Sequence, residues 1–370
     1  MKTLRKLIYG EVLLAVGFVT LAFLALFAFF DLIDELPALG QRAALDPTLE
    51  YGLAQALLYV ALQQPNNLYE LLPITLLIGT VYALVRLAQA TEFTILRTSG
   101  LGPWLALRQM LVLGLAFAAL TFAIGDYLAP WSDRQAQLLQ ATYQGRISIG
   151  QTGAWLKERD PQRQIAVNVR ALEPDGSLRQ VRVFEFDTQG RLVRTLQAER
   201  ATVSASAWQL QQVQVRQFDT QALPPRLHAQ DLAQMDWPTG LSADMVSVAL
   251  LRTDRMSTWA LYQYIEHLQA NQQATQRYEI EFWRKIFYPL SCLVMVVLAL
   301  PFAYLHFRAK GVAAYVFAGV MLGLSFVLLS NMFGYIGNLL AWRPWLAAAA
   351  PALLYSVASL GAFGWLVLRR

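Results

Sequence analysis

Cysteine and histidine are scarce in this chain of 370 residues, which has one cysteine and three histidines. A single cysteine, Cys292, excludes an internal disulfide framework and a cluster of thiolate ligands. The histidines, His228, His267 and His306, lie far apart in the sequence and form no cluster of metal-ligating residues. We therefore expect no metal site.

Two motifs that carry catalysis are also missing. The sequence has neither a G-x-x-x-x-G-K-S/T phosphate-binding loop nor a G-x-S-x-G nucleophile elbow. We expect a subunit without catalytic residues or bound cofactors, so that any ATP energy comes from a partner chain. A membrane enzyme whose site is assembled from distant residues stays an alternative.

Charged residues are few as well: 15% of the chain is charged, 56% is hydrophobic, and the mean hydropathy is +0.37. This composition is typical of a membrane protein. A helix needs about 20 apolar residues to cross the hydrocarbon, because each backbone polar group in lipid must find its partner inside the segment. Six segments meet this requirement and predict an all-α bundle of six spans: Val12–Ile33, Leu68–Ala88, Trp104–Leu128, Ile286–Tyr304, Val312–Leu340 and Trp345–Leu368.

The first of these segments is predicted to stay in the protein as a span. Its basic start resembles that of a signal peptide, but its apolar core is too long and no clear small-residue cleavage site follows.

Basic residues flank the predicted spans mainly on one side. Lys and Arg in short loops mark the cytoplasmic side of a membrane protein, so both termini are predicted to be cytoplasmic. The opposite side then carries the acidic residues after the first span and the long segment between spans three and four. The net charge of +5 includes no dense basic run, so nucleic acid is not an expected partner. The cytoplasmic residues are Lys2, Arg5, Lys6, Arg86, Arg97, Arg108, Arg308, Lys310, Arg369 and Arg370.

The segment 130–255 is predicted to be a β-rich soluble insert, because it holds about half of the charged residues. Apolar residues alternate with polar ones along 165–171 and 181–183, and Pro174–Ser177 and Thr188–Arg191 have the composition of hairpin turns. The alternation slips between Val183 and Phe184 and again between Leu210 and Val213, which predicts bulges or strong curvature. We expect a curved β-sandwich between two membrane domains, 1–129 and 256–370.

Residues beyond the insert predict an amphipathic helix on the membrane surface. Trp259, Leu261, Tyr262, Ile265 and Leu268 recur at helical spacing before the fourth span. A solvated connector helix is the alternative.

Several segments resemble the lipopolysaccharide export permease family of the LptF/LptG type, and its G-type members in particular. The resemblance covers essentially the whole chain and rests on the order of the segments around the insert. These segments are FDLID at Phe30–Asp34, EFTILRTSG at Glu92–Gly100, AP at Ala129–Pro130 and YEIEFWRKIFYPL at Tyr278–Leu290.

The resemblance implies a multi-pass protein of the bacterial inner membrane with a periplasmic β-jellyroll. It implies a heterodimer with an F-type permease, powered by two copies of a cytoplasmic ATPase that use ATP and Mg. Lipopolysaccharide would be extracted from the inner membrane and passed to a single-span bridge protein of the LptC type and a further bridge jellyroll of the LptA type.

The cytoplasmic segment 91–99 is predicted to be a helix that couples this chain to the ATPase. Thr91 suits an N-cap, Glu92 adds negative charge at the positive end of the helix dipole, and Gly100 with Pro103 gives a stop. Phe93 and Leu96 share a face. The coupling residues would be Glu92, Phe93, Leu96 and Arg97, and an ordinary loop helix is the alternative.

A phosphorylated, acylated lipid needs an apolar cavity with cations at its outer mouth. Candidates for the acyl region are Phe23, Phe27, Phe30, Phe326, Met332 and Phe333, although such residues also face lipid or other helices. Candidates for the phosphates are Arg134, Arg146, Arg284 and Lys285, of which the last two also suit snorkelling to headgroups.

One stretch departs from the family pattern. Some G-type members carry lysines at and after the end of the first span, where this chain has Asp31, Asp34 and Glu35. Either a divalent cation bridges Asp34 and its neighbours to the phosphates, or basic residues elsewhere take over.

Two further readings of the insert stay open. Its strand edges suit extension by the strands of another protein, and Arg-rich edges that block such pairing are the alternative. A membrane scaffold or receptor whose insert binds a periplasmic partner is the rival to the permease.

Overall fold

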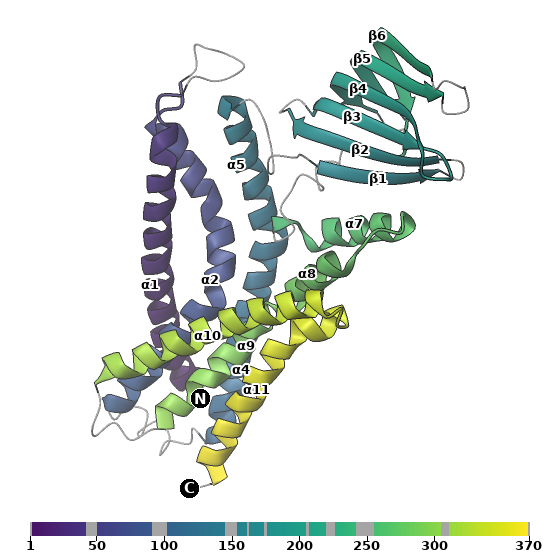
Figure 1. Ribbon diagram of the computed structural model, residues 1–370. Helices are drawn as coiled ribbons and strands as arrows, with labels where there is room; N and C mark the ends of the chain where they lie inside the picture. The colour runs from purple at the N-terminus through teal and green to yellow at the C-terminus, as the bar shows by residue number, and fades with distance from the viewer. Residues whose placement is uncertain are drawn as a thin grey trace. The chain divides into compact units, whose positions relative to one another are not determined.

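The computed structural model describes residues 2–41, 50–90, 102–144, 154–160, 163–173, 176–204, 207–219, 226–241, 255–304 and 311–368. The chain divides into two compact units. The first comprises Met1–Asp34, Gln63–Ser132 and Gln276–Arg370, and is helical. The second comprises Glu35–Leu62 and Asp133–Thr275, and contains the β-sheet (Figure 1).

Five of the described helices are long and apolar enough to cross a membrane, and the pair α8 with α9–η4 makes a sixth span if it is counted as one. The six-span prediction is confirmed with that pair included. The helices are α1 (Lys2–Glu35), α2 (Leu53–Gln89), α4 (Pro103–Ala123), α5 (Ala129–Gln144), α8 (Gln276–Phe287), α9 (Ser291–Ala299), α10 (Val312–Leu339) and α11 (Pro344–Leu368); the turns are η1 (Leu36–Ala38), the π-helical η2 (Ile124–Leu128) and η4 (Leu300–Tyr304).

The bounds of three spans differ from the prediction. Helix α2 begins at Leu53 rather than Leu68, because Pro65 and the polar residues around it lower the hydropathy without ending the helix. The third span continues through η2 into α5 as far as Gln144. The fourth span is not one straight helix, since α8 and α9 meet at a bend of 49°.

Helix α2 lies at the centre of the bundle, whereas α1 and α10 lie at its periphery. In the most apolar stretch of α2, 78% of residues are buried, against 22% in α1 and 17% in α10. Lipid tails give helices no hydrophobic drive to associate, so contact depends on close packing and on hydrogen bonds between helices. The exposed apolar faces of α1 and α10 are available to lipid or to another membrane chain.

Close packing of α1 on α2 depends on a glycine. A Cβ atom at Gly79 would lie 2.6 Å from the backbone Cα of Val16, so only glycine lets the two helices approach this closely. Nearby, the buried Thr20 hydroxyl donates to the Thr75 hydroxyl across the same interface at 2.9 Å. A second close approach joins α4 to α9, where a Cβ at Gly114 would lie 3.0 Å from the Leu293 Cα.

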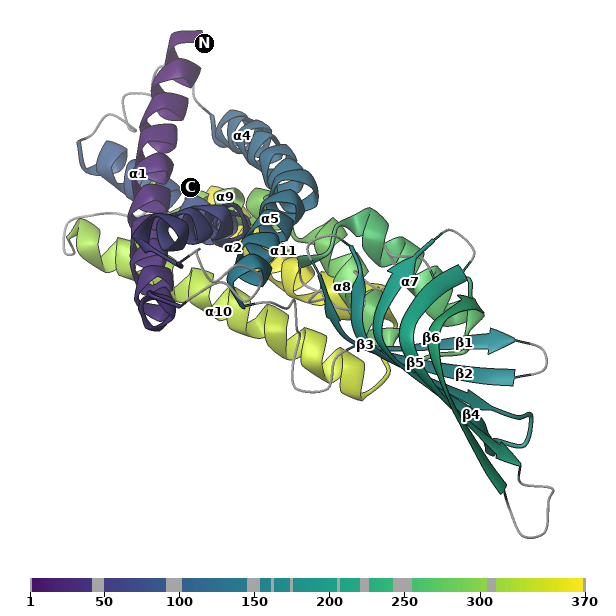
Figure 2. The ribbon, with the colours of Figure 1, turned by 90° about the horizontal axis from the view of Figure 1, so that it is seen from above.

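The described residues of the insert form one six-stranded antiparallel sheet whose strands follow in sequence order, so the predicted β-rich insert is confirmed. Figure 2 shows the sheet curving along its strands. The strands on either side of both predicted turns pair as hairpins, and the described turn glycines Gly176 (φ 83°) and Gly190 (φ 78°) lie in the left-handed region. The strands are β1 (Ala154–Asp160), β2 (Arg163–Leu172), β3 (Leu178–Phe186), β4 (Leu192–Val203), β5 (Ala207–Asp219) and β6 (Arg226–Pro238).

Two irregular residues interrupt the regular pairing of the sheet. Gln180 on β3 and Gln212 on β5 have positive φ angles of 49° and 52°. The residue pairing skips both of them, and Leu210 and Val213 are both buried, which confirms the predicted slip there. The slip predicted between Val183 and Phe184 is wrong at that point, because the pairing of β3 with β4 shifts register two residues further on, between Glu185 and Phe186.

The error has an electrostatic origin. Val183 and Glu185 are both buried, so the alternation of β3 continues through this point. Glu185 occupies a core-facing position and accepts a hydrogen bond from Arg163 Nη1 at 3.1 Å, which compensates its burial. Because a charged residue occupies this core-facing position, the sequence pattern wrongly indicated that the alternation of buried and exposed residues shifts here.

One end of the sheet is closed by side chains. The Glu158 carboxylate on β1 accepts from the Thr239 hydroxyl at 2.5 Å and from the Gly240 N–H at 2.8 Å, just beyond β6. Trp208 Nε1 donates to the Leu241 carbonyl at 2.8 Å. These bonds tie the segment after the last strand to β1 and β5.

The helix predicted beyond the insert is present as α7 (Thr258–Ala270), but the expected apolar face is divided. Leu261, Ile265 and Leu268 are buried, whereas Trp259 and Tyr262 are exposed on another face. All five residues recur at helical spacing, so the sequence pattern alone could not separate the buried face of the helix from the exposed one.

The glycine contact predicts opposite effects for two matched substitutions. Gly79→Ala is expected to lower the stability of the detergent-solubilised protein by about 1–3 kcal/mol, because the added methyl group meets the backbone of α1. Gly17→Ala, on the exposed side of α1 with nothing within 4 Å, is expected to leave it unchanged or higher, since alanine favours helix by about 1 kcal/mol. Thermal unfolding measures both, and equal destabilisation would contradict the packing argument.

Candidate functional site

The predicted coupling segment lies outside the described residues. Helix α2 ends at Gln89 and α4 begins at Pro103, after Gly102. The roles of Glu92, Phe93, Leu96 and Arg97 therefore stay predictions, as does that of Arg146, which is also outside the described residues.

The acyl-region candidates lie in different surroundings. On α1, Phe27 and Phe30 are exposed and Phe23 is half-buried. On α10, Met332 is exposed, whereas Phe326 is buried with its ring against Tyr355 at 5.2 Å between centroids. Phe333 is half-buried and packs on Trp342 at 6.1 Å. Phe326 therefore belongs to the interior of the bundle, and the α1 residues belong to an open apolar face.

Amide and hydroxyl groups bind two of the acidic residues at the end of α1. Asp31 Oδ2 accepts from Asn67 Nδ2 at 3.0 Å and from Gln64 Nε2 at 3.4 Å, both on α2. Glu35 Oε2 accepts from the Tyr51 hydroxyl at 3.1 Å. Burial and the nearby Glu35 raise the pKa of Tyr51, which keeps its hydroxyl a donor. Asp34 is exposed.

The fourth span is broken at a proline. Pro289 has no N–H to continue the helical ladder, and the chain instead makes short-range bonds. The Tyr288 N–H still donates four residues back, to the Arg284 carbonyl at 2.7 Å. The Ser291 N–H donates only three residues back, to the Tyr288 carbonyl at 3.0 Å, and the Ser291 hydroxyl donates to the same carbonyl at 2.5 Å. The break therefore keeps much of its backbone hydrogen-bonded while it changes direction.

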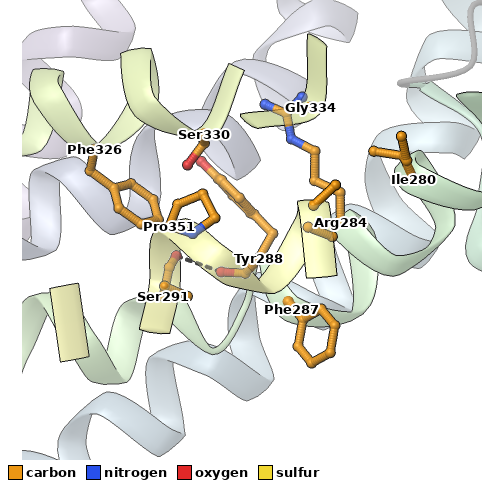
Figure 3. Close-up of a pocket in the computed structure, with 12 residues that line it drawn as sticks. Ile280, Arg284, Phe287, Tyr288, Ser291, Phe326, Ser330, Gly334 and Pro351 are labelled. Carbon is orange, nitrogen blue, oxygen red and sulfur yellow. Dashed lines mark hydrogen bonds between the residues drawn. The ribbon is translucent and has the colours of Figure 1, made fainter. Parts of the chain in front are cut away.

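A small pocket lies beside this break, among α8, α9, α10 and α11 (Figure 3). Its volume of about 20 Å³ is room for roughly one water molecule, so it cannot hold an acyl chain. Arg284 at the pocket donates to Asn331 Oδ1 at 2.7 Å and lies 3.6 Å from Glu281. Phe326 and Pro351 line its apolar side in Figure 3.

Lys285 is buried within the helical unit rather than extended toward headgroups. Its residue exposure is 8%, and its Nζ lies 3.4 Å from the Gly125 carbonyl in η2 and 5.8 Å from the centroid of the Tyr69 ring. A buried ammonium is costly unless polar groups surround it, so it marks a specific environment within the membrane. Its predicted contact with phosphate stays a prediction, as does that of the exposed Arg134.

Two irregular helix segments meet at this lysine. The π-helical η2 in the third span supplies the carbonyl, and the break of the fourth span follows Lys285 by three residues. Tyr288 in the break packs on Tyr69 of α2 at 4.9 Å between centroids and donates to the Glu70 carbonyl at 2.6 Å. We call Tyr69, Gly125, Lys285 and Tyr288 the junction cluster.

Gly125 is required by this arrangement, because a side chain there would clash with the Tyr69 ring. Single-turn π segments inside helices occur frequently at functional sites. Sequence reasoning missed Tyr69, Gly125 and Tyr288, which contact one another across long stretches of chain. The available signal was a lysine directly before the apolar segment of the fourth span, four residues before a proline.

Comparisons with known proteins agree with this architecture. The family described as "Lipopolysaccharide export system permease LptF/LptG" matches residues 6–369. The Lipopolysaccharide export system permease protein LptG of Escherichia coli K12 is 26% identical over 342 residues, which cover 91% of this chain and 90% of that protein. The protein of the same name from Haemophilus influenzae is 26% identical over 359 residues and 96% of each chain.

The burial of Lys285 predicts that its charge serves activity rather than stability. Taking an ammonium group out of water is costly, and methionine has a similar volume without the charge, so Lys285→Met is expected to unfold at an equal or higher temperature. The same variant is expected to lose transport activity when it replaces the native protein in the cell. Arg277→Met, an exposed residue on the same helix, is the control with the same charge change and is expected to stay active. Full activity of Lys285→Met would leave the lysine a structural role only.

Proposed function

Because the chain belongs to the lipopolysaccharide export permease LptF/LptG family, we propose that it is a membrane-spanning subunit that moves lipopolysaccharide out of the bacterial inner membrane. The match over residues 6–369 carries this proposal, since it includes both the helical unit and the β insert. The six apolar spans provide a surface for acyl chains within the hydrocarbon.

A second membrane chain completes the lipid path in this proposal. The pocket of about 20 Å³ at the fourth span is too small for an acyl chain. The apolar faces of α1 and α10 are mostly exposed, including Phe27, Phe30 and Met332. An F-type permease that packs near these faces would enclose a cavity between the two subunits.

Energy comes from partner chains in the same proposal. The sequence has no phosphate-binding loop, so two copies of a cytoplasmic ATPase would bind ATP and Mg. The segment between α2 and α4 would dock on them and pass their movement to the second and third spans. Both termini would then be cytoplasmic, as the distribution of Lys and Arg indicates.

The β insert would deliver the lipid on the periplasmic side. Strands β1 and β6 are the two edges of the described sheet, and unpaired edges bind additional strands through backbone hydrogen bonds. A single-span bridge protein of the LptC type, followed by a jellyroll of the LptA type, would extend the sheet there.

Co-purification tests the assembly directly. The tagged chain, extracted gently from its native membrane, is expected to bring with it a second six-span permease, an ATPase and lipopolysaccharide, as identified by mass spectrometry. A stable chain recovered without lipid or partners would contradict the assembly and favour a scaffold.

The docking segment generates a charge-reversal prediction. We expect Glu92 to pair with a basic residue of the ATPase. Glu92→Arg is therefore expected to leave folding and membrane insertion intact but to stop transport while ATP is still hydrolysed, because the reversed charge repels that residue. Glu199→Arg, at an exposed position of β4, makes the same charge change away from the segment and is expected to transport normally. Reconstituted proteoliposomes measure both activities, and normal transport by Glu92→Arg would refute the coupling role.

A further inference from the structure

Helix α7 carries a pair of aromatic side chains that the fold of its own unit does not cover. Trp259 is 65% exposed and Tyr262 is 49% exposed, and their rings stack at 5.8 Å between centroids with an interplanar angle of 23°. The opposite face of the helix is buried through Leu261, Ile265 and Leu268. The buried face therefore holds α7 in place, and the aromatic pair lies on the exposed face.

The start of α7 is attached to the helix that continues the third span. Arg255, two residues before the N-cap Ser257, forms an ion pair with Asp133 of α5. The side chains of these two residues are only 22% and 5% exposed, so water screens the pair little. Asp133 also accepts from Gln137 Nε2 at 2.7 Å, which fixes its orientation.

Asp133 lies close to the point where the third span leaves the apolar region. The continuous helix from α4 through η2 into α5 becomes polar after Pro130, at Ser132 and Asp133. Tyr127 and Trp131, just before this change, are 70% and 58% exposed. Trp and Tyr at the end of a span are typical of the membrane–water interface, where the ring is apolar and its polar atom stays wet.

The other end of α7 is tied to the fourth span by the chain itself. Five residues separate Ala270 from Gln276, where α8 begins, and such a connection reaches at most about 20 Å. At about 1.5 Å per residue, α7 is itself only about 20 Å long. The ion pair and the short connection thus hold both ends of α7 near segments that enter the bilayer.

We propose that Trp259 and Tyr262 form an anchor that inserts into the headgroup region of the bilayer and fixes the base of the β insert to the membrane surface. The exposed face of α7 is aromatic in its first turns and polar toward its end, with Gln263, Glu266 and Gln269. Only the first part of the helix would enter the interface. The polar end would stay in water.

The occupant is lipid rather than another protein, because both attachments of α7 lead to membrane spans. This inference requires that the chain spans a membrane, but it does not depend on which molecule is exported. Its failure would leave the proposed function standing.

Spin labels measure the depth of α7 in the full chain. Cys292 is buried and is replaced by Cys292→Ser, which keeps a partner for the Thr121 hydroxyl. Tyr262→Cys in this background is labelled with a nitroxide and placed in phospholipid nanodiscs. Gln209→Cys, exposed on β5, is the control.

The label at position 262 is expected to collide several-fold more often with oxygen than with a water-soluble nickel complex, relative to the label at position 209. It is also expected to interact with doxyl groups near the lipid headgroups. A label that is as accessible to nickel as the control would overturn the anchor. A label shielded from both nickel and doxyl lipids would also overturn it, because a protein would then cover the site. Trp259→Cys tests the same contact if Tyr262→Cys does not fold.

Discussion

The hydrocarbon core of a bilayer offers no water to backbone N–H and C=O groups, so each such group must find a partner within the protein. Regular helices meet this demand along most of the described spans. The departures from regular α-helix include the π-helical η2 in the third span and the break at Pro289 in the fourth. They meet at the junction cluster, where Lys285 approaches the Gly125 carbonyl and the Tyr288 hydroxyl donates to Glu70.

The same demand explains how the helices contact one another. Without a hydrophobic drive between them, they depend on close approach and on a few hydrogen bonds. Gly79 and Gly114 supply the close approach, and the Thr20–Thr75 bond supplies a polar contact. These interactions hold the helices together and leave the apolar faces of α1 and α10 open, where the proposed second membrane chain would pack.

Much of the fold follows from the sequence, and the exceptions share a physical cause. Hydropathy located the spans, and alternation with turn glycines at Gly176 and Gly190 located the strands. The prediction failed where a side chain depends on a partner distant in sequence. The buried Glu185 was taken for an exposed residue of β3, because its hydrogen bond with Arg163 is not visible in the sequence pattern. Of the junction cluster, only Lys285 was selected from the sequence, since its neighbours Tyr69 and Gly125 come from distant parts of the chain and from a π segment that hydropathy does not reveal.

The most direct test of the central claim is the fate of newly made lipopolysaccharide when this chain is depleted from the bacterium that encodes it. Pulse-labelled lipopolysaccharide, separated by membrane fraction, should remain in the inner membrane after depletion and reach the outer membrane again when the chain is expressed. Normal delivery to the outer membrane in depleted cells would contradict the assignment as a lipopolysaccharide export permease.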